Sequence, residues 1–171
     1  MKRLSSGCTI ALSSDMTADD LATFILALKI YNLSDVTLDM SKMSITSIAS
    51  GAFSGCEAIR SVIIGGSITT IGERAFRACT SLTSVEISGS VTSIGSYAFD
   101  NCTSLTIVTI GSAVTLIVSS AFGYCEALTT VYYNGTKDEW GEISIADTSS
   151  ENGNYYLTQA TIICTDGEYE W

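Results

Sequence analysis

The chain has 171 residues, of which 46% are hydrophobic, and a mean hydropathy of +0.34, so it holds enough apolar side chains for a continuous core. Its apolar runs are far too short to cross a bilayer. The net charge of −10 repels phosphate backbones and argues against nucleic-acid binding. Residues 138–171 hold eight acids and no base, which places the acidity mainly near the C-terminus.

The sequence contains no histidine. Ser-His-Asp and Cys-His catalysis are therefore absent, and so is the commonest general base and metal ligand. No glycine-rich phosphate-binding motif follows a predicted strand. We therefore expect no catalytic residues, no cofactor and no resident metal.

The N-terminus begins with the bases Lys2 and Arg3, but no apolar stretch long enough for a signal peptide follows. We see no export signal, and we interpret residues 5–8 as an ordinary N-terminal strand or tail. Residues 15–31 are predicted to form a helix, with Thr17 and Asp20 arranged much like a capping box. Its apolar stripe can cover the end of the first repeat, and it consists of Leu21, Phe24, Leu28 and Tyr31.

The centre of the chain repeats one pattern every 23 residues. The same apolar triplet is predicted to mark six strands, and both end intervals are longer than 23. The triplets are Leu33 Val36 Leu38, Ile59 Val62 Ile64, Leu82 Val85 Ile87, Leu105 Val108 Ile110, Leu128 Val131 Tyr133 and Leu157 Ala160 Ile162. A period of 23 lies within the range of leucine-rich repeats, in which stability comes from stacking equivalent residues of successive repeats.

Within one repeat, Val85 and Ile87 alternate with polar residues, which indicates a strand with one buried face. Gly89 and Ser90 turn the chain, and later apolar residues return to the core. Each repeat then places an Ala-Phe pair on a short helical or 3₁₀ turn and closes with a cysteine. The phenylalanines are Phe53, Phe76, Phe99 and Phe122, and the cysteines are Cys56, Cys79, Cys102 and Cys125.

The C-terminal part departs from the repeat. Thr136 and Glu139 form a capping box that predicts a short helix. Trp140 lies 23 residues after Ile117, and we expect it to take over that position in the core. Residues 147–154 read as a turn-rich insertion, residues 155–164 supply the last strand, and the acidic residues 166–171 are expected to be mobile.

The pattern LxxVxIxxxVxxIxxxAFxxC over residues 45–136 resembles the BspA-like leucine-rich repeats of bacterial surface proteins. The segments YYNGTKDEWGEI and LTQATIICTDG resemble the repeat that closes such arrays. The resemblance implies a right-handed solenoid with a parallel concave sheet. Together with the predicted elements, this gives a mainly β repeat solenoid with about six strands, an N-terminal capping helix and an atypical C-terminal capping repeat. It also implies an exported protein used for adhesion or other protein contacts.

On this interpretation residues 1–171 form a single leucine-rich-repeat domain. Residues 1–44 make the N-terminal cap and first strand, residues 45–136 make four 23-residue repeats, and residues 137–171 make the C-terminal cap. The resemblance implies an extracellular or cell-surface location, while the lack of a visible export signal leaves a cytoplasmic one open.

The four repeat cysteines invite a metal or disulfide hypothesis, because neighbouring strands lie about 4.8 Å apart. One cysteine per repeat makes a line, however, whereas zinc needs four ligands that converge. We therefore expect them to be small buried hydrophobes, and six thiols to be titratable in the denatured protein.

Function is expected where the repeats differ, on the outward strand positions. Ile63, Ile107 and Tyr132 are candidate anchors of a binding surface, or they pack only against neighbouring strands. The middle row of this surface is predicted to run from Thr37 through Ile63 and Glu86 to Thr109 and Tyr132. The full candidate surface on the concave sheet is Thr37, Ile63, Ser84, Glu86, Ile107, Thr109, Thr130 and Tyr132.

Three hypotheses follow. The first is a non-enzymatic adhesion or interaction module that binds a protein ligand, such as a host surface or matrix protein, or a glycan. The second is a structural spacer within a larger cell-surface protein. The third, an enzyme, lacks a nucleophile–base pair in the sequence. The sequence is compatible with binding on either the concave or the convex face.

Overall fold

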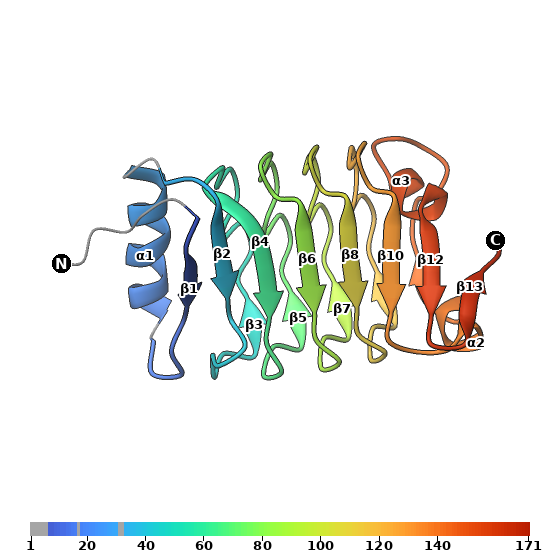
Figure 1. Cartoon of the computed structure of the whole chain (residues 1–171), viewed down its shortest axis with the longest axis horizontal. Coiled ribbons are helices and arrows are strands. Elements are labelled where there is room, and N and C mark those ends of the chain that lie inside the picture. Colours follow the sequence, from blue (N-terminus) through green and yellow to red (C-terminus); the bar gives the residue numbers. More distant parts are fainter. Residues whose placement is uncertain (1–6, 17, 31–32) are drawn as a thin grey trace.

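The computed structural model describes residues 7–16, 18–30 and 33–171, and Figure 1 shows them as an elongated stack of strands. The longer strand of each repeat contributes to one sheet, and a short strand contributes to a second. The longer strands are β2 (Val36–Asp39), β4 (Ile59–Ile64), β6 (Ser84–Ile87), β8 (Ile107–Ile110), β10 (Thr130–Tyr133) and β12 (Thr161–Cys164). The short ones are β3 (Ser47–Ile48), β5 (Thr70–Ile71), β7 (Ser93–Ile94), β9 (Leu116–Ile117) and β11 (Ser144–Ile145).

All six predicted strands are present, and two edge strands extend their sheet to eight. These are β1 (Thr9–Ala11), which pairs in parallel with β2, and β13 (Gly167–Tyr169), which pairs antiparallel with β12. The last predicted strand is shorter than expected, because residues 155–159 form the helix α3 (Tyr155–Gln159) and only Thr161–Cys164 pair in the sheet. The order of the sheet is β1-β2-β4-β6-β8-β10-β12-β13. The short strands form a parallel five-stranded sheet in the order β11-β9-β7-β5-β3. The fold is thus a leucine-rich-repeat solenoid.

The core between the sheets is built from stacked copies of the same residue. The rings of Phe53 and Phe76 stack with centroids 5.0 Å apart, and the next two steps, to Phe99 and Phe122, are 5.3 Å each. All four rings are fully buried. The 23-residue period therefore becomes the step from one repeat to the next, as the sequence predicts.

The Ala-Phe turn contains single 3₁₀-type hydrogen bonds, such as Cys79 N–H to the Phe76 carbonyl at 3.3 Å. It also needs two left-handed residues per repeat. The first repeat supplies Gly51 and Gly55, both with φ of 67°, which suit this conformation. Later repeats place other residues there, namely Arg74, Ala78, Tyr97, Asn101, Ser120 and Tyr124.

The predicted register is correct between β4 and β10 but wrong at both ends. Val62 pairs with Leu38 rather than with Val36, and a bulge between Val36 and Thr37 shifts the pairing by one residue within β2. At the other end, Val131 pairs with Ile162 rather than with Ala160. Each error is two residues, so the inward and outward alternation of side chains is kept.

The N-terminal cap is α1 (Ala18–Ile30), which lies at the end of the solenoid in Figure 1. Leu21 and Leu28 are buried and Phe24 is partly buried, as the predicted stripe requires. The other member of the stripe, Tyr31, and the predicted cap residue Thr17 lie outside the described residues.

The C-terminal cap begins with α2 (Lys137–Gly141), whose Thr136–Glu139 capping box is formed as predicted. Trp140 is buried, but it does not occupy the position predicted for it, because Ile145 is the residue that pairs with Ile117. The α2 helix sets the tryptophan against Tyr133 instead, with ring centroids 5.2 Å apart.

The series of backbone hydrogen bonds that links each phenylalanine to the next repeat ends at Asn154, in the insertion before α3 (Tyr155–Gln159). In earlier repeats the Phe N–H donates to the alanine carbonyl of the next repeat, as from Phe99 to Ala121 at 2.7 Å. After Phe122 no such alanine follows, and its N–H donates to Asn154 Oδ1 at 3.0 Å. The Asn154 Nδ2 donates to the carbonyls of Val118 and Ala146 at 2.9 and 2.6 Å. One buried side chain thus replaces a missing piece of backbone.

The prediction of a mobile acidic tail is wrong. Residues 167–169 form β13 on the edge of the larger sheet, and the Trp171 ring lies 6.3 Å from the Trp140 ring. Asp166 also accepts a hydrogen bond from the Lys137 backbone N–H at 2.9 Å. The aromatic and backbone contacts hold this segment against the cap in spite of its charge.

Candidate functional site

The outward face of the eight-stranded sheet carries two rows of side chains defined by strand register. The hydroxyl row contains Thr9, Thr37, Ser61, Ser84, Ile107, Thr130 and Thr161. The mixed row contains Ala11, Asp39, Ile63, Glu86, Thr109, Tyr132 and Ile163. Seven of the eight predicted surface residues lie in the expected row. The exception is Thr37, which the register between β2 and β4 places in the hydroxyl row, opposite Ser61 rather than beside Ile63.

The hydroxyl row is mostly small and half-buried. Ser84 Oγ donates to Ser61 Oγ at 2.9 Å, so part of its hydrogen-bonding capacity is used along the row. Ile107 interrupts this polar strip and leaves 40% of its surface exposed. An exposed branched aliphatic residue amid hydroxyls is a better candidate for partner contact than the serines and threonines beside it.

Three apolar side chains lie together on β8, β10 and β12, and we call Ile107, Tyr132 and Ile163 the sheet patch. Tyr132, which is 43% exposed, pairs with Ile163 on one side. On the other side it pairs with Thr109, which makes Ile107 its diagonal neighbour on the adjacent strand. Diagonal neighbours are within reach of an aromatic side chain. The patch therefore spans three consecutive strands.

The structure does not bring the third predicted anchor, Ile63, into this patch. Ile63 lies on β4 and is separated from β8 by β6, a distance of roughly 10 Å at the usual strand spacing. Sequence reasoning missed Ile163, because the last strand was assigned a register two residues away. The signal was present in the sequence: Ile162 and Ile163 are adjacent, so when one points inward the other must point outward.

The charges on the mixed row are all negative. Asp39 and Glu86 flank Ile63 on its two sides, and Glu168 of β13 lies opposite Ile163. The hydroxyl and backbone N–H of Ser41 both bond the Asp39 carboxylate and hold its pKa below the ordinary value. Among these two rows no lysine or arginine occurs. The sheet face therefore suits a partner that is apolar at the patch and basic around it.

The five-stranded sheet is a weaker candidate. Its most exposed large apolar residue is Leu116, which is 39% exposed. Leu116 pairs with Ser93 on one side and Ser144 on the other, so no apolar cluster surrounds it. Single exposed hydrophobic residues are normal on protein surfaces. The eight-stranded sheet is thus the better of the two faces.

The repeat cysteines lie in the core as a line of thiols. The Sγ–H groups of Cys79, Cys102 and Cys125 each donate to a Phe carbonyl of the preceding repeat, at 3.1 to 3.2 Å. Burial raises the pKa of the Cys102 and Cys125 thiols, which keeps them protonated at neutral pH and poor as nucleophiles. The line is a structural feature, and all six cysteines of the chain are thiols.

Within residues 7–16, 18–30 and 33–171 no three Cys, Asp or Glu side chains cluster so as to hold a metal ion. Over the same residues, the helices fall short of the length and apolar character needed to cross a membrane.

Comparison with known families gives a match to the BspA type leucine rich repeat region, in six copies over residues 27–151. This chain belongs to that family. The matched region includes the four 23-residue repeats and ends before α3 and β12.

Two solved structures are similar to this BspA-type chain. A leucine rich cell surface protein from Faecalibacterium prausnitzii A2-165 is 25% identical with a TM-score of 0.57, over 65% of this chain and 35% of that protein. A leucine-rich repeat protein of T. pallidum is 29% identical with a TM-score of 0.53, over 57% of this chain and 46% of that protein. Either match spans less than half of the other protein's length. Comparison with curated proteins found no match.

Proposed function

We propose that this chain is a non-enzymatic protein-interaction module, and that the outward face of the eight-stranded sheet binds a protein ligand. The observation that carries the proposal is the sheet patch, in which Ile107 and Tyr132 are exposed as diagonal neighbours on adjacent strands. Aromatic and aliphatic anchors surrounded by polar residues form the centre of many protein interfaces. The family supports a repeat module of this kind.

The ligand belongs outside the cell in this proposal. The similar protein from Faecalibacterium prausnitzii is described as a cell surface protein, and the repeats of this chain are of the same leucine-rich type. That location supports our proposal of an extracellular adhesion role, with a host surface or matrix protein as ligand. Protease treatment of intact cells that express the native gene tests the location, since a surface protein is degraded and a cytoplasmic one is protected.

Two matched variants test the binding face. Ile107→Asp places a charge in the sheet patch, and Leu116→Asp places one on the opposite sheet at a residue of nearly equal exposure, 40% against 39%. Binding to arrayed matrix proteins, cell-surface proteins and glycans is compared for the two variants and the wild type. We expect Ile107→Asp to weaken protein binding at least about tenfold, the usual effect of losing an interface anchor, and Leu116→Asp to leave it unchanged.

Equal binding by the wild type and Ile107→Asp would refute this face as the site, and a glycan as the sole ligand would refute the protein class. The second candidate function is a structural spacer, which is favoured by the small share of both similar proteins that this chain covers. A spacer predicts no ligand on the array for the wild type or for either variant.

A further inference from the structure

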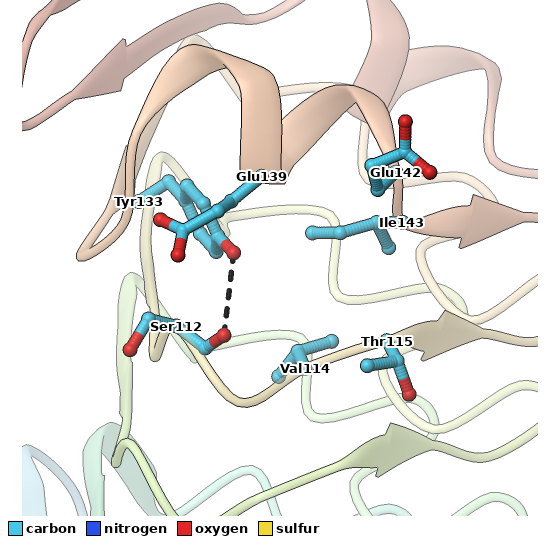
Figure 2. Close-up of a pocket in the computed structure, with 7 residues that line it drawn as sticks. All are labelled: Ser112, Val114, Thr115, Tyr133, Glu139, Glu142 and Ile143. Carbon is cyan, nitrogen blue, oxygen red and sulfur yellow. Dashed lines mark hydrogen bonds between the residues drawn. The ribbon is translucent and has the colours of Figure 1, made fainter.

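A hollow lies at the carboxyl ends of β8 and β10, apart from the sheet face. Its volume is about 200 Å³, which is ample for several waters or a small ligand. Figure 2 shows the residues around it, which come from the turn after β8, the end of β10 and the α2 segment. They are Ser112, Val114, Thr115, Tyr133, Glu139, Glu142 and Ile143. The hollow lies outside the proposed binding face, and neither the stacked phenylalanine rings nor the line of thiols lines it.

The floor of the hollow is apolar and its polar groups are mostly acceptors. Val114 and Ile143 are buried and point toward the hollow in Figure 2. The Tyr133 hydroxyl donates its proton to the Ser112 carbonyl at 3.3 Å, which leaves lone pairs on Oη for another donor. The Glu139 side chain descends beside the ring, while the Glu142 carboxylate lies at the rim and points outward in Figure 2. The Thr115 hydroxyl already donates to the Thr92 carbonyl.

The hydrogen bonds that the Glu139 carboxylate already makes limit which ligand can bind in the hollow. Its Oε2 accepts hydrogen bonds from the Thr136 backbone N–H at 2.7 Å and from the Thr136 hydroxyl at 3.1 Å. This leaves Oε1 as the acceptor available to a ligand. Burial and the nearby Glu139 charge both raise the pKa of Tyr133, so the phenol stays neutral at physiological pH.

We propose that the hollow binds a primary alkylammonium group, and that its ligand is a lysine side chain of a partner protein. The methylenes would lie on Val114 and Ile143, and the ammonium would donate to Glu139 Oε1 and Tyr133 Oη. Two carboxylates repel an anion. A guanidinium is a poorer fit, because its planar fork is best matched by both oxygens of one carboxylate, whereas an ammonium bonds to separate acceptors.

Placement and charge favour a protein as the source of the lysine. The hollow lies at the ends of β8 and β10, the two strands that carry Ile107 and Tyr132. A protein on the sheet face can therefore extend a basic side chain around the strand ends. The eight acids and no base of residues 138–171 attract such a partner.

The test is a titration of the full chain with butylammonium, followed by the NMR signals of the Val114 and Ile143 methyl groups. 1-Butanol is the uncharged control. We expect saturable shifts with a Kd on the order of 1–10 mM, the range open to so small a ligand, and much weaker shifts with butanol. Equal affinity for the two, or shifts that do not saturate, would overturn the proposal.

Two variants locate the site. Glu139→Gln keeps the capping box, which accepts Gln as well as Glu, but removes the charge. It should weaken butylammonium binding about fivefold, the effect of one charged hydrogen bond reduced by solvent exposure, whereas the exposed Glu126→Gln should have no effect. Tyr133→Phe should also weaken it, and gives the same answer if Glu139→Gln does not fold. Unchanged affinity in the folded variants would refute the assignment.

The source of the ammonium is tested with blocked lysine, N-acetyl-lysine methylamide, against 1,4-diaminobutane. Blocked lysine should bind at least as tightly as butylammonium. Tenfold tighter binding of the diamine would mean that a polyamine is the ligand and would overturn the protein source. Ile107→Asp should leave these affinities unchanged, so the hollow and the proposed sheet face can fail independently.

Discussion

Replacing Asn154 should destabilise the whole C-terminal end of the solenoid. Its side chain is fully buried and makes three hydrogen bonds, one from the Phe122 N–H and two to the carbonyls of Val118 and Ala146. In Asn154→Ala these three backbone groups lose their partner, and each such loss costs about 1–3 kcal/mol when the group stays buried. Partial hydration of the carbonyls lowers the sum, so we expect a loss of about 3–5 kcal/mol in the free energy of unfolding.

Asn154→Asp separates hydrogen bonding from packing. The aspartate has nearly the same shape and still accepts from Phe122, but it loses both donors and turns a negative oxygen toward two carbonyls. If the Asn154 hydrogen bonds are what matter, Asp should destabilise at least as much as Ala at neutral pH. If packing is what matters, Asp should be almost harmless.

Urea unfolding followed by circular dichroism measures both losses, and hydrogen exchange reports on the Phe122 amide. Asn152→Ala is the matched control, because Asn152 is an exposed residue of the same insertion and should change stability by less than about 0.5 kcal/mol. A cost below about 1 kcal/mol for Asn154→Ala, or an unchanged exchange rate at Phe122, would refute the assignment of Asn154 as the end of this series of hydrogen bonds.

Two further predictions concern the repeats. Ala78→Gly should stabilise the chain by about 0.5–1 kcal/mol in urea unfolding, because Ala78 has a φ of 56° where the first repeat has Gly55. Ala75→Gly is the control, because Ala75 is buried and is not among the residues with positive φ, and it should destabilise the chain. A loss of stability in Ala78→Gly would contradict the inference that the left-handed backbone at Ala78 is strained. Titration with a thiol reagent should find six thiols after denaturation, whereas in the native protein only the half-buried Cys8 should react quickly, because the other five are buried. A denatured count of two, or fast reaction of the four repeat cysteines, would contradict the thiol ladder.

The sequence predicts the central repeats of this fold well, because its 23-residue period is also the number of residues that separates two paired positions on neighbouring strands. When two strands are 23 residues apart and every repeat has the same length, the residue opposite Val85 must be Val62 or Val108. The ends lack this constraint. The strand before β4 and the strand after the 147–154 insertion each lie two residues away from the register that the apolar triplets predict, and the longer end intervals do not say by how much.

The candidate site was predictable in part for the same reason. Ile107 and Tyr132 belong to regular repeats, so their neighbourhood follows from the period, whereas Ile163 follows the insertion and was missed. The role of Asn154 could not be predicted, since one asparagine in a polar turn looks like any other turn residue. The order of the acidic tail depends on the pairing of β13 with β12, on the hydrogen bond to Asp166 and on the contact between Trp140 and Trp171, none of which a local pattern encodes.

The division between inward and outward positions makes the proposed binding face testable without unfolding the protein. An inward residue such as Phe99 is fully buried between two stacked rings, and truncation of a buried phenylalanine costs about 3–5 kcal/mol. An outward residue such as Tyr132 contributes mainly through cross-strand pairs, which are worth about 0.2–1 kcal/mol each. Substitutions in the sheet patch should therefore change the melting temperature little, and a loss of binding in those variants can be attributed to the surface itself.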